Sequence, residues 1–255
     1  MNPLGLFLGL VVGFVLGLLG GGGSILALPI FLYVFRVETK PAVAMSLAVV
    51  GISAFIGFLT HWRQGTVRLR IAIPFGLFAM LAAFVTARLA RVVPAAVQLG
   101  LFAAFAFTAA FFMLRDSLKP DVPSAGPNES GPGTFGALLA GQAIGVGVLT
   151  SLIGAGGGFV IVPALVLLAG VPVKPAVGSS LLIITMNSLS GFAGYIGQVP
   201  IDWGLIGSFA PVAAVGAVIG TRYSRRVPQR RIKQGFAILI VVLGSYLIVR
   251  RLSGL

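Results

Sequence analysis

A run of glycines inside an apolar segment occurs twice in this chain of 255 residues. The first copy is Gly-Gly-Gly-Gly-Ser-Ile-Leu-Ala-Leu-Pro at 20–29, and a looser copy, Gly-Ala-Gly-Gly-Gly-Phe-Val-Ile-Val-Pro, follows 134 residues later at 154–163. Consecutive glycines interrupt a helix, and interrupted backbone in lipid leaves N–H and C=O groups without partners. Such a break is tolerated only where protein buries it or where it lines a polar cavity. Equivalent breaks in the two halves of a membrane chain point to the binding site of a transporter.

The composition indicates an all-α polytopic membrane protein. Hydrophobic residues make up 58% of the chain and charged residues 9%, and the mean hydropathy is +1.07. Apolar runs of about 20 residues fit helical spans, and the alternation typical of membrane strands is absent. The net charge of +13 does not indicate nucleic-acid binding, because Lys and Arg lie at the ends of apolar segments, as they do at a cytoplasmic membrane surface. The absence of cysteine excludes disulfides, thiolate metal sites and thiol catalysis.

The two halves align without a gap at the constant offset of 134, from about Gly17 to Asp116. Lys-Pro-Ala-Val at 40–43, for example, matches the same four residues at 174–177. Composition bias alone would not keep Lys, Gln, Arg and Pro in register over this length. Pro, Gly and charged residues gather between the halves and predict an exposed linker. We therefore divide the chain into a first membrane repeat at 1–115, the linker at 116–133 and a second membrane repeat at 134–255.

Each repeat opens with an apolar segment that is too long for one span. A continuous helix over 4–35 would be roughly 48 Å long, against a hydrocarbon core of about 30 Å. The glycines divide this segment into either a re-entrant hairpin or a tilted, broken span. Three full spans plus a hairpin would make the repeats inverted, whereas four full spans would make them parallel. We favour inverted repeats because of the segment length. The expected apolar segments are 4–35, 41–60, 71–90 and 95–114 in the first repeat, and 135–169, 175–196, 203–221 and 234–249 in the second.

Each glycine run is expected to start a half-helix, at Ile25 and at Phe159. The first turn of a helix has free N–H groups and the positive end of the helix dipole, which together bind an anion without a charged side chain. Ser24 is expected at the N-cap of the first half-helix. The alternative role is close helix packing, but packing motifs place their glycines on one helical face. The residues assigned here to substrate binding are Gly20, Gly21, Gly22, Gly23, Ser24, Gly154, Gly156, Gly157 and Gly158.

Lys40 and Lys174 each precede a proline that fits the first turn of the next helix. If the preceding hairpin is re-entrant, the lysine faces the cavity and is satisfied by an anion. The alternative is an interfacial lysine that extends its ammonium group to the membrane surface. We include both lysines in the expected binding site.

A polar stripe follows on the helix after each lysine. Uncharged hydrogen-bond donors in the middle of the membrane suit a dehydrated oxyanion. The alternative role of these side chains is hydrogen bonding between helices. For Asn187 we favour substrate binding, because its amide is costly to bury without a partner. The stripe comprises Ser46 and Ser53 in the first half and Ser179, Ser180, Thr185, Asn187 and Ser188 in the second, of which Ser46, Ser179, Ser180 and Asn187 are assigned to the substrate site.

Several chemistries lack the residues that they need. The five acidic residues all lie at segment ends or in the linker, so a carboxylate relay is missing and a cation would lack its counter-ion. The sole histidine, His61, could pair with Ser24 in an intramembrane hydrolase, but a histidine beside Trp62 and Arg63 is more typical of the membrane boundary. HExxH and GxxxxGK[ST] are absent, so zinc hydrolysis and ATP-driven transport find no support. We expect an anion carrier that is not an enzyme and holds no metal or cofactor.

The doubled glycine motif, the two Lys-Pro-Ala-Val steps and Gly-Gln-Val-Pro-Ile-Asp-Trp at 197–203 resemble the sulfite exporter TauE/SafE family. The resemblance covers nearly the whole chain outside the linker. It implies transport of small sulfur- or carbon-containing anions, such as sulfite or sulfonates, across a bacterial or archaeal inner membrane. One departure is His-Trp-Arg at 61–63, where the second half has Tyr-Ile-Gly at 195–197, so the two half-sites are not identical.

The sequence thus predicts a secondary transporter in the lipid bilayer, with a small anionic substrate bound between the two repeats. Rocking of one repeat against the other would give alternating access. A passive anion channel is the alternative, and the intramembrane hydrolase is a third possibility.

Overall fold

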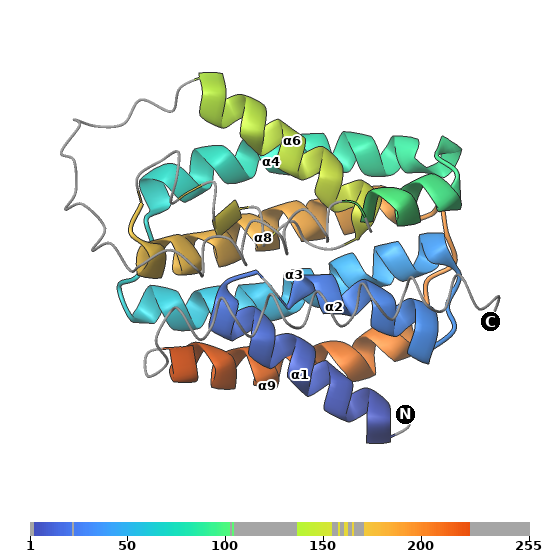
Figure 1. Cartoon of the computed structure of the whole chain (residues 1–255), viewed down its shortest axis with the longest axis horizontal. Helices are drawn as coiled ribbons and strands as arrows, with labels where there is room; N and C mark the ends of the chain where they lie inside the picture. The colour runs from blue at the N-terminus through green and yellow to red at the C-terminus, as the bar shows by residue number, and fades with distance from the viewer. Residues whose placement is uncertain are drawn as a thin grey trace.

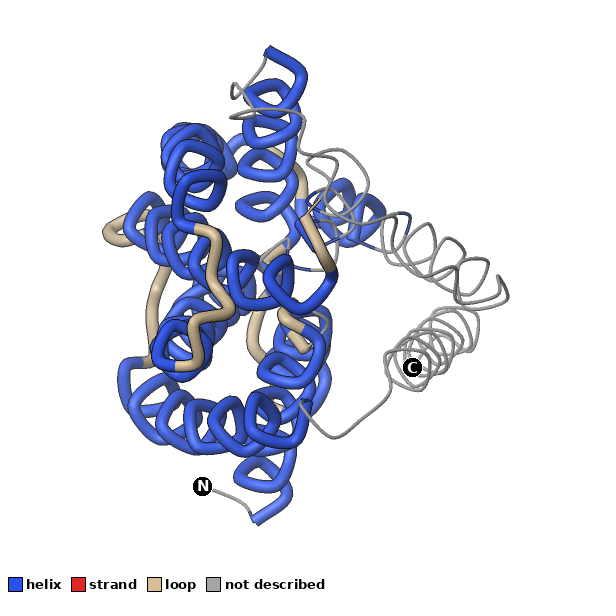
Figure 2. Tube along the Cα trace, turned by 90° about the vertical axis from the view of Figure 1, so that its left-hand side faces the viewer, coloured by secondary structure: helices blue, strands red, loops and turns tan. Residues whose placement is uncertain are grey.

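The computed structural model describes residues 3–21, 23–102, 104, 137–154, 158, 161–162, 165 and 171–224. All elements in these ranges are helical, which confirms the predicted all-α class (Figure 2). The linker predicted at 116–133 and the apolar segment at 234–249 lie outside the described residues, and the division into two repeats stays a prediction. The elements are α1 (Pro3–Leu19), α2 (Ser24–Pro29), the π-helical turn η1 (Ile30–Val34), α3 (Thr39–Arg63), α4 (Leu69–Leu89), the 3-10 turn η2 (Ala90–Val92), α6 (Ala137–Ile153), α8 (Val173–Tyr195) and α9 (Trp203–Ser224).

Four of these helices are long and apolar enough to cross a membrane, namely α3, α4, α8 and α9. The predicted apolar segment at 4–35 is interrupted, because α1 ends at Leu19 and α2 begins at Ser24. With 17 residues, α1 is about 26 Å long, which is less than the roughly 30 Å of a hydrocarbon core. In the second half α6 also has 17 residues and ends just before Gly154. Within the described residues, both helices that end at a glycine run are shorter than a full span.

Helices α3 and α8 form the centre of the bundle. Within their most apolar stretches 78% of α3 and 61% of α8 is buried, against 28% of α4 and 44% of α9. Gly51 on α3 packs against Leu189 on α8, and Gly57 packs against Leu181. Because higher numbers on α3 meet lower numbers on α8, the two helices run antiparallel (Figure 1). Helices that occupy equivalent positions in the two halves of the sequence thus point in opposite directions.

Each short first helix packs on the last described span of the opposite half. Gly13 on α1 lies against the backbone carbonyl of Ala213 on α9, and Gly147 on α6 lies against that of Ala79 on α4. Both contacts depend on glycine, since an added Cβ would overlap the facing carbonyl oxygen. The pairs are equivalent at the offset of 134, because 147 matches 13 and 213 matches 79. The core around the breaks is thereby assembled from both halves.

Candidate functional site

Both glycine runs begin with the same backbone turn. Gly20 has φ +66° and Gly154 has φ +70°, a left-handed conformation that glycine adopts without a steric penalty. The N–H of Gly20 donates to the carbonyl of Leu16 at 2.9 Å, and that of Gly154 donates to the carbonyl of Thr150 at 2.8 Å. These are helix C-terminal turns of the kind that glycine commonly provides. The structure thus ends the helices where the glycine runs predicted a break.

The carbonyl of each break is held by a serine from the other half. Ser46 on α3 donates its hydroxyl to Gly154 O at 2.7 Å, and Ser180 on α8 donates to Gly20 O at 2.5 Å. Ser180 is the equivalent of Ser46 at the offset of 134. A carbonyl at a helix end has no donor within its own helix, and burial removes water as a donor. The two serines therefore satisfy the helix-end carbonyls that the breaks expose.

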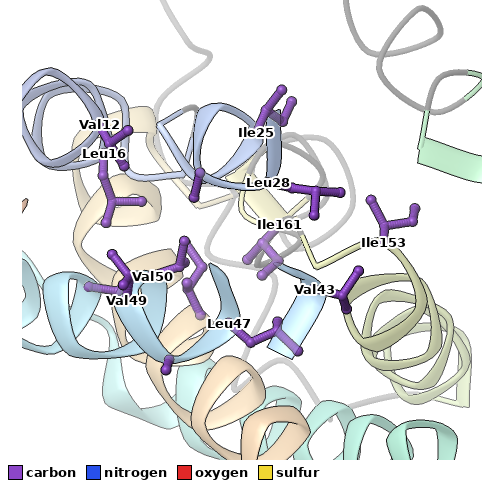
Figure 3. Packing of buried hydrophobic residues seen from close by; sticks show 14 of the residues in the cluster. Val12, Leu16, Ile25, Leu28, Val43, Leu47, Val49, Val50, Ile153 and Ile161 are labelled. Atoms are coloured by element: carbon purple, nitrogen blue, oxygen red, sulfur yellow. The ribbon is translucent and has the colours of Figure 1, made fainter. Parts of the chain in front are cut away.

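The two breaks also touch each other in the interior. The backbones of Gly21 and Gly158 are in contact, and a Cβ on either residue would overlap the backbone of the other. The buried apolar cluster of the interior contains side chains from both halves, among them Leu16, Leu28 and Ile161 (Figure 3). Gly20, Gly21, Gly23, Gly154 and Gly158 are all buried. Gly22, Gly156 and Gly157, which were also assigned to the site, lie outside the described residues.

Ser24 is not the N-cap that the sequence predicted. The N-cap of α2 is Gly23, and Ser24 is the first helical residue. Its hydroxyl donates back to the carbonyl of Gly21 at 2.6 Å, a local bond that competes with capping. The N–H groups of Ser24 and Leu26 donate to the carbonyls of Gly21 and Gly23 at 3.1 Å, so they are occupied in this structure. Gly158 is already helical, and Phe159, where the second half-helix was expected to start, lies outside the described residues.

Asn187 joins the centre of α8 to the second break. Its Nδ2 donates to Thr150 Oγ1 on α6 at 2.8 Å, and the Thr150 carbonyl accepts the Gly154 N–H. Asn187 is fully buried, and its Oδ1 has no hydrogen-bond partner among the described residues. Sequence reasoning overlooked Thr150. The sequence did contain an indication, namely a difference between the halves. Two polar residues, Thr-Ser at 150–151, precede the second break, whereas the equivalent residues before the first break are Leu-Gly at 16–17.

Two serines of the predicted stripe are buried without a partner. The hydroxyls of Ser53 on α3 and Ser188 on α8 make no hydrogen bond within the described part of the chain, although both residues are fully buried. Thr185, by contrast, bonds to the carbonyl of Leu181 one turn earlier at 2.7 Å. Ser53 is the equivalent of Asn187 at the offset of 134. Both central helices therefore carry an unpaired polar atom at the same repeat position.

The remaining predicted residues lie towards the ends of the helices. Ser179 accepts the Arg68 N–H at 2.8 Å and so holds the α3–α4 loop rather than a break. Lys40 is half-buried in the first turn of α3, and its proline occupies that turn as predicted. Lys174 lies in the first turn of α8, and its side chain is outside the described residues. The assignment of these three residues to substrate binding stays a prediction.

The serine–histidine pair of a hydrolase does not form. Ser24 donates to Gly21, whereas the ring Nδ1 of His61 lies 2.9 Å from Thr66 Oγ1 near the α3–α4 loop. A nucleophile needs its base within hydrogen-bond reach. The arrangement gives no support to the hydrolase alternative.

Comparisons with known proteins agree with a membrane transporter. The family model described as "Sulfite exporter TauE/SafE" matches residues 5–247. A "Probable membrane transporter protein" of Xylella fastidiosa (strain 9a5c) is 31% identical over 96% of this chain and 94% of its own length. The probable membrane transporter protein YdhB of Bacillus subtilis is 25% identical over 93% and 96% of the two chains, and MJ0441 of Methanocaldococcus jannaschii is 26% identical over 97% and 95%. No solved structure gives a significant match.

Proposed function

Because this multi-pass membrane protein belongs to the sulfite exporter TauE/SafE family, whose curated relatives are named probable membrane transporters, we propose that it is a secondary transporter of a small anion. The substrate class is sulfite, an organosulfonate or a related sulfur or carboxylate oxyanion. The two repeats are inverted, and the substrate crosses by alternating access between them. The relatives come from bacteria and an archaeon, so we place the protein in the cytoplasmic membrane of such a cell.

The observation that carries this proposal is the reciprocal pair of hydrogen bonds at the breaks. Ser46 bonds to Gly154 and Ser180 bonds to Gly20, so each half holds the interrupted helix of the other. Together with the antiparallel course of α3 and α8, this exchange supports two repeats related by an axis in the membrane plane. Transporters with inverted repeats bind substrate at the repeat interface, beside discontinuous helices.

The charge distribution favours an anion. The acidic residues in the described part of the chain are Glu38, which precedes the first turn of α3 and makes no capping bond with its side chain, and Asp202, whose Oδ1 accepts the Leu205 N–H at the start of α9. Both lie at helix ends. A cation at the centre of the bundle would therefore find no counter-ion, whereas hydroxyl, amide and backbone N–H groups can donate to an oxyanion.

Counterflow in proteoliposomes tests the proposal against a passive channel. Vesicles loaded with unlabelled methanesulfonate or sulfite are diluted into a trace of the same labelled anion at zero membrane potential. A carrier that alternates between two faces accumulates label transiently above its equilibrium level, since outward and inward steps share one site. A channel only equilibrates the label. Absence of flux for every oxyanion tested, or flux without accumulation, would contradict a carrier function.

A further inference from the structure

We propose that the hydroxyls of Ser53 and Ser188 and the amide of Asn187 contact the transported anion, and that this neutral group selects singly charged oxyanions over doubly charged ones. The inference rests on the proposed transport function. It adds two contact residues that were not assigned to the site from the sequence, and it restricts the charge of the substrate.

Three buried polar atoms on the central helices lack hydrogen-bond partners. Ser53 Oγ, Ser188 Oγ and Asn187 Oδ1 make no hydrogen bond in the described ranges, and all three residues are fully buried. Burying a polar atom unpaired carries a free-energy penalty. A helical serine can avoid this penalty by bonding to a carbonyl one turn earlier, as Ser46 and Ser180 do with Val43 and Val177. Ser53 and Ser188 do not, which leaves them available to a ligand.

Ser53 and Ser188 lie in the stretch where the central helices pack against each other. The contacts of Gly51 with Leu189 and of Gly57 with Leu181 lie on either side of the crossing. Ser53 is one turn before Gly57 and about 40° from it around α3, but about 160° from Gly51, so helical spacing places it at the edge of the face that meets α8. Ser188 is two turns after Leu181, which places it on the side of α8 that faces α3. Ser53 and Ser188 are therefore at about the same level on α3 and α8, and Asn187, about 100° around α8 from Ser188, is turned towards α6.

Asn187 connects this level to the second break. Its hydrogen bond to Thr150 places its amide beside the last turn of α6, which precedes Gly154. Oxygen and nitrogen of a carboxamide are assigned from the hydrogen-bond network, and Thr150 can bond either atom. With Nδ2 bonded to Thr150, the remaining Oδ1 can only accept, whereas with Oδ1 accepting from the Thr150 hydroxyl, Nδ2 remains and can donate to an anion. The contact proposed for Asn187 uses the second orientation. The group then consists of two hydroxyls and one amide, which together can donate to the oxygens of an oxyanion.

The middle stretches of the two central helices carry no charged side chain. From Pro41 to Thr60 on α3 and from Pro175 to Tyr195 on α8, the sequence contains no charged residue. Lys40 precedes Ser53 by 13 residues and Lys174 precedes Asn187 by 13, which corresponds to about 20 Å along each helix. Removing an ion from water without a paired charge is costly, and the cost rises steeply with the charge of the ion. A monoanion such as an alkanesulfonate or hydrogen sulfite fits this group, whereas a dianion such as sulfate does not.

Competition in the counterflow assay tests the charge selectivity. Labelled methanesulfonate is the probe, and unlabelled methanesulfonate, sulfate and thiosulfate are the competitors. We expect the two dianions to require at least a tenfold higher concentration for half-inhibition. Equal inhibition by sulfate and methanesulfonate would overturn the charge selectivity while leaving transport intact. Absence of counterflow by the unmodified protein with any anion would instead overturn the proposed function itself.

Ser53→Ala and Ser188→Ala test the contact residues. Each removes a hydroxyl that has no partner in the protein, so the variant is expected to fold and to melt no lower than the unmodified chain. If the hydroxyl bonds to the anion, its loss weakens the apparent affinity for methanesulfonate by about tenfold, as for one hydrogen bond to a charged group. Ser208→Ala is the matched control, because its exposed hydroxyl bonds to Gly204 O on its own helix. Unchanged affinity in both test variants would overturn the assignment.

Discussion

Replacing Ser46 with alanine leaves the buried carbonyl of Gly154 without its donor, and replacing Ser180 does the same to Gly20. The Ser46 hydroxyl lies 2.8 Å from Val43 O and 2.7 Å from Gly154 O, but its single hydrogen is shared between them. Val43 O lies within a helix and has its own backbone donor, whereas Gly154 O lies beyond the end of α6. The loss therefore falls on the glycine carbonyl.

The expected loss of stability is that of one buried carbonyl that loses part of a hydrogen bond, because the hydroxyl hydrogen is shared between two acceptors. A buried acceptor left unpaired costs about 1–3 kcal/mol, and interhelical hydrogen bonds in membranes contribute about 0.6 kcal/mol on average and up to about 1.7. We expect Ser46→Ala and Ser180→Ala each to lower the free energy of unfolding by about 1–1.5 kcal/mol. At the upper end this is roughly a tenfold change in the unfolding equilibrium. The two losses should be similar, because the two bonds are equivalent at the offset of 134.

Reversible unfolding by SDS in mixed micelles measures these free energies. Ser208→Ala again serves as the control and should stay within about 0.5 kcal/mol of the unmodified protein, as surface substitutions usually do. The double variant should deviate from the sum of the single variants, because the two breaks touch at Gly21 and Gly158 and neighbouring sites couple. If one serine mattered and the other did not, the reciprocal role of the pair would be refuted.

Three further predictions concern packing, the polar core and orientation. Gly13→Ala should lower the melting temperature, since its Cβ would overlap a carbonyl on α9 at a typical overpacking cost of about 1–3 kcal/mol, whereas Gly207→Ala, with open space around it, should not. Thr150→Val should destabilise the protein by about 1–3 kcal/mol in the same unfolding assay, because it leaves a buried amide wholly unpaired. Three arginines lie at and beside the loop between α3 and α4, which places this loop on the cytoplasmic side. A single cysteine introduced there as Gln64→Cys should react with an impermeant maleimide only from the cytoplasmic side. A single cysteine introduced after α8 as Val199→Cys should react only from the opposite side. Reaction of both from one side would contradict the inverted arrangement.

The helices and the two breaks could be predicted from the sequence, because they depend on local chemistry. An apolar run as long as a membrane span favours a helix over its own residues, and a run of glycines ends a helix at its own position. The left-handed turns at Gly20 and Gly154 follow directly from those glycines. The first-turn positions of the prolines in α3 and α8 follow in the same way, since proline lacks only a donor that the first turn does not use.

The hydrogen-bond partners could not be predicted, because they depend on how the halves pack. The residue type allowed Ser24 to cap α2, but a carbonyl three residues earlier competed for its hydroxyl. Nothing near Ser46 in the sequence indicates Gly154, which is 108 residues away. Ser179 and Ser180 are adjacent in the predicted stripe, yet one holds the α3–α4 loop and the other holds a break, since neighbouring residues on a helix point about 100° apart.

The symmetry of the breaks and the asymmetry of the polar atoms beside them indicate different roles. Gly20 matches Gly154 and Ser46 matches Ser180, and these four residues form bonds within the protein. The polar residues beside the breaks differ between the halves, because at the offset of 134 Asn187 matches Ser53 and Thr150 matches Leu16. An identical pair suits a scaffold that both halves must share, whereas a single bound anion has no need of two equal half-sites. On the proposed contacts the second half supplies most of the donors, and a substrate with one polar end is expected to bind with that end towards α8 in both states of the proposed transport cycle.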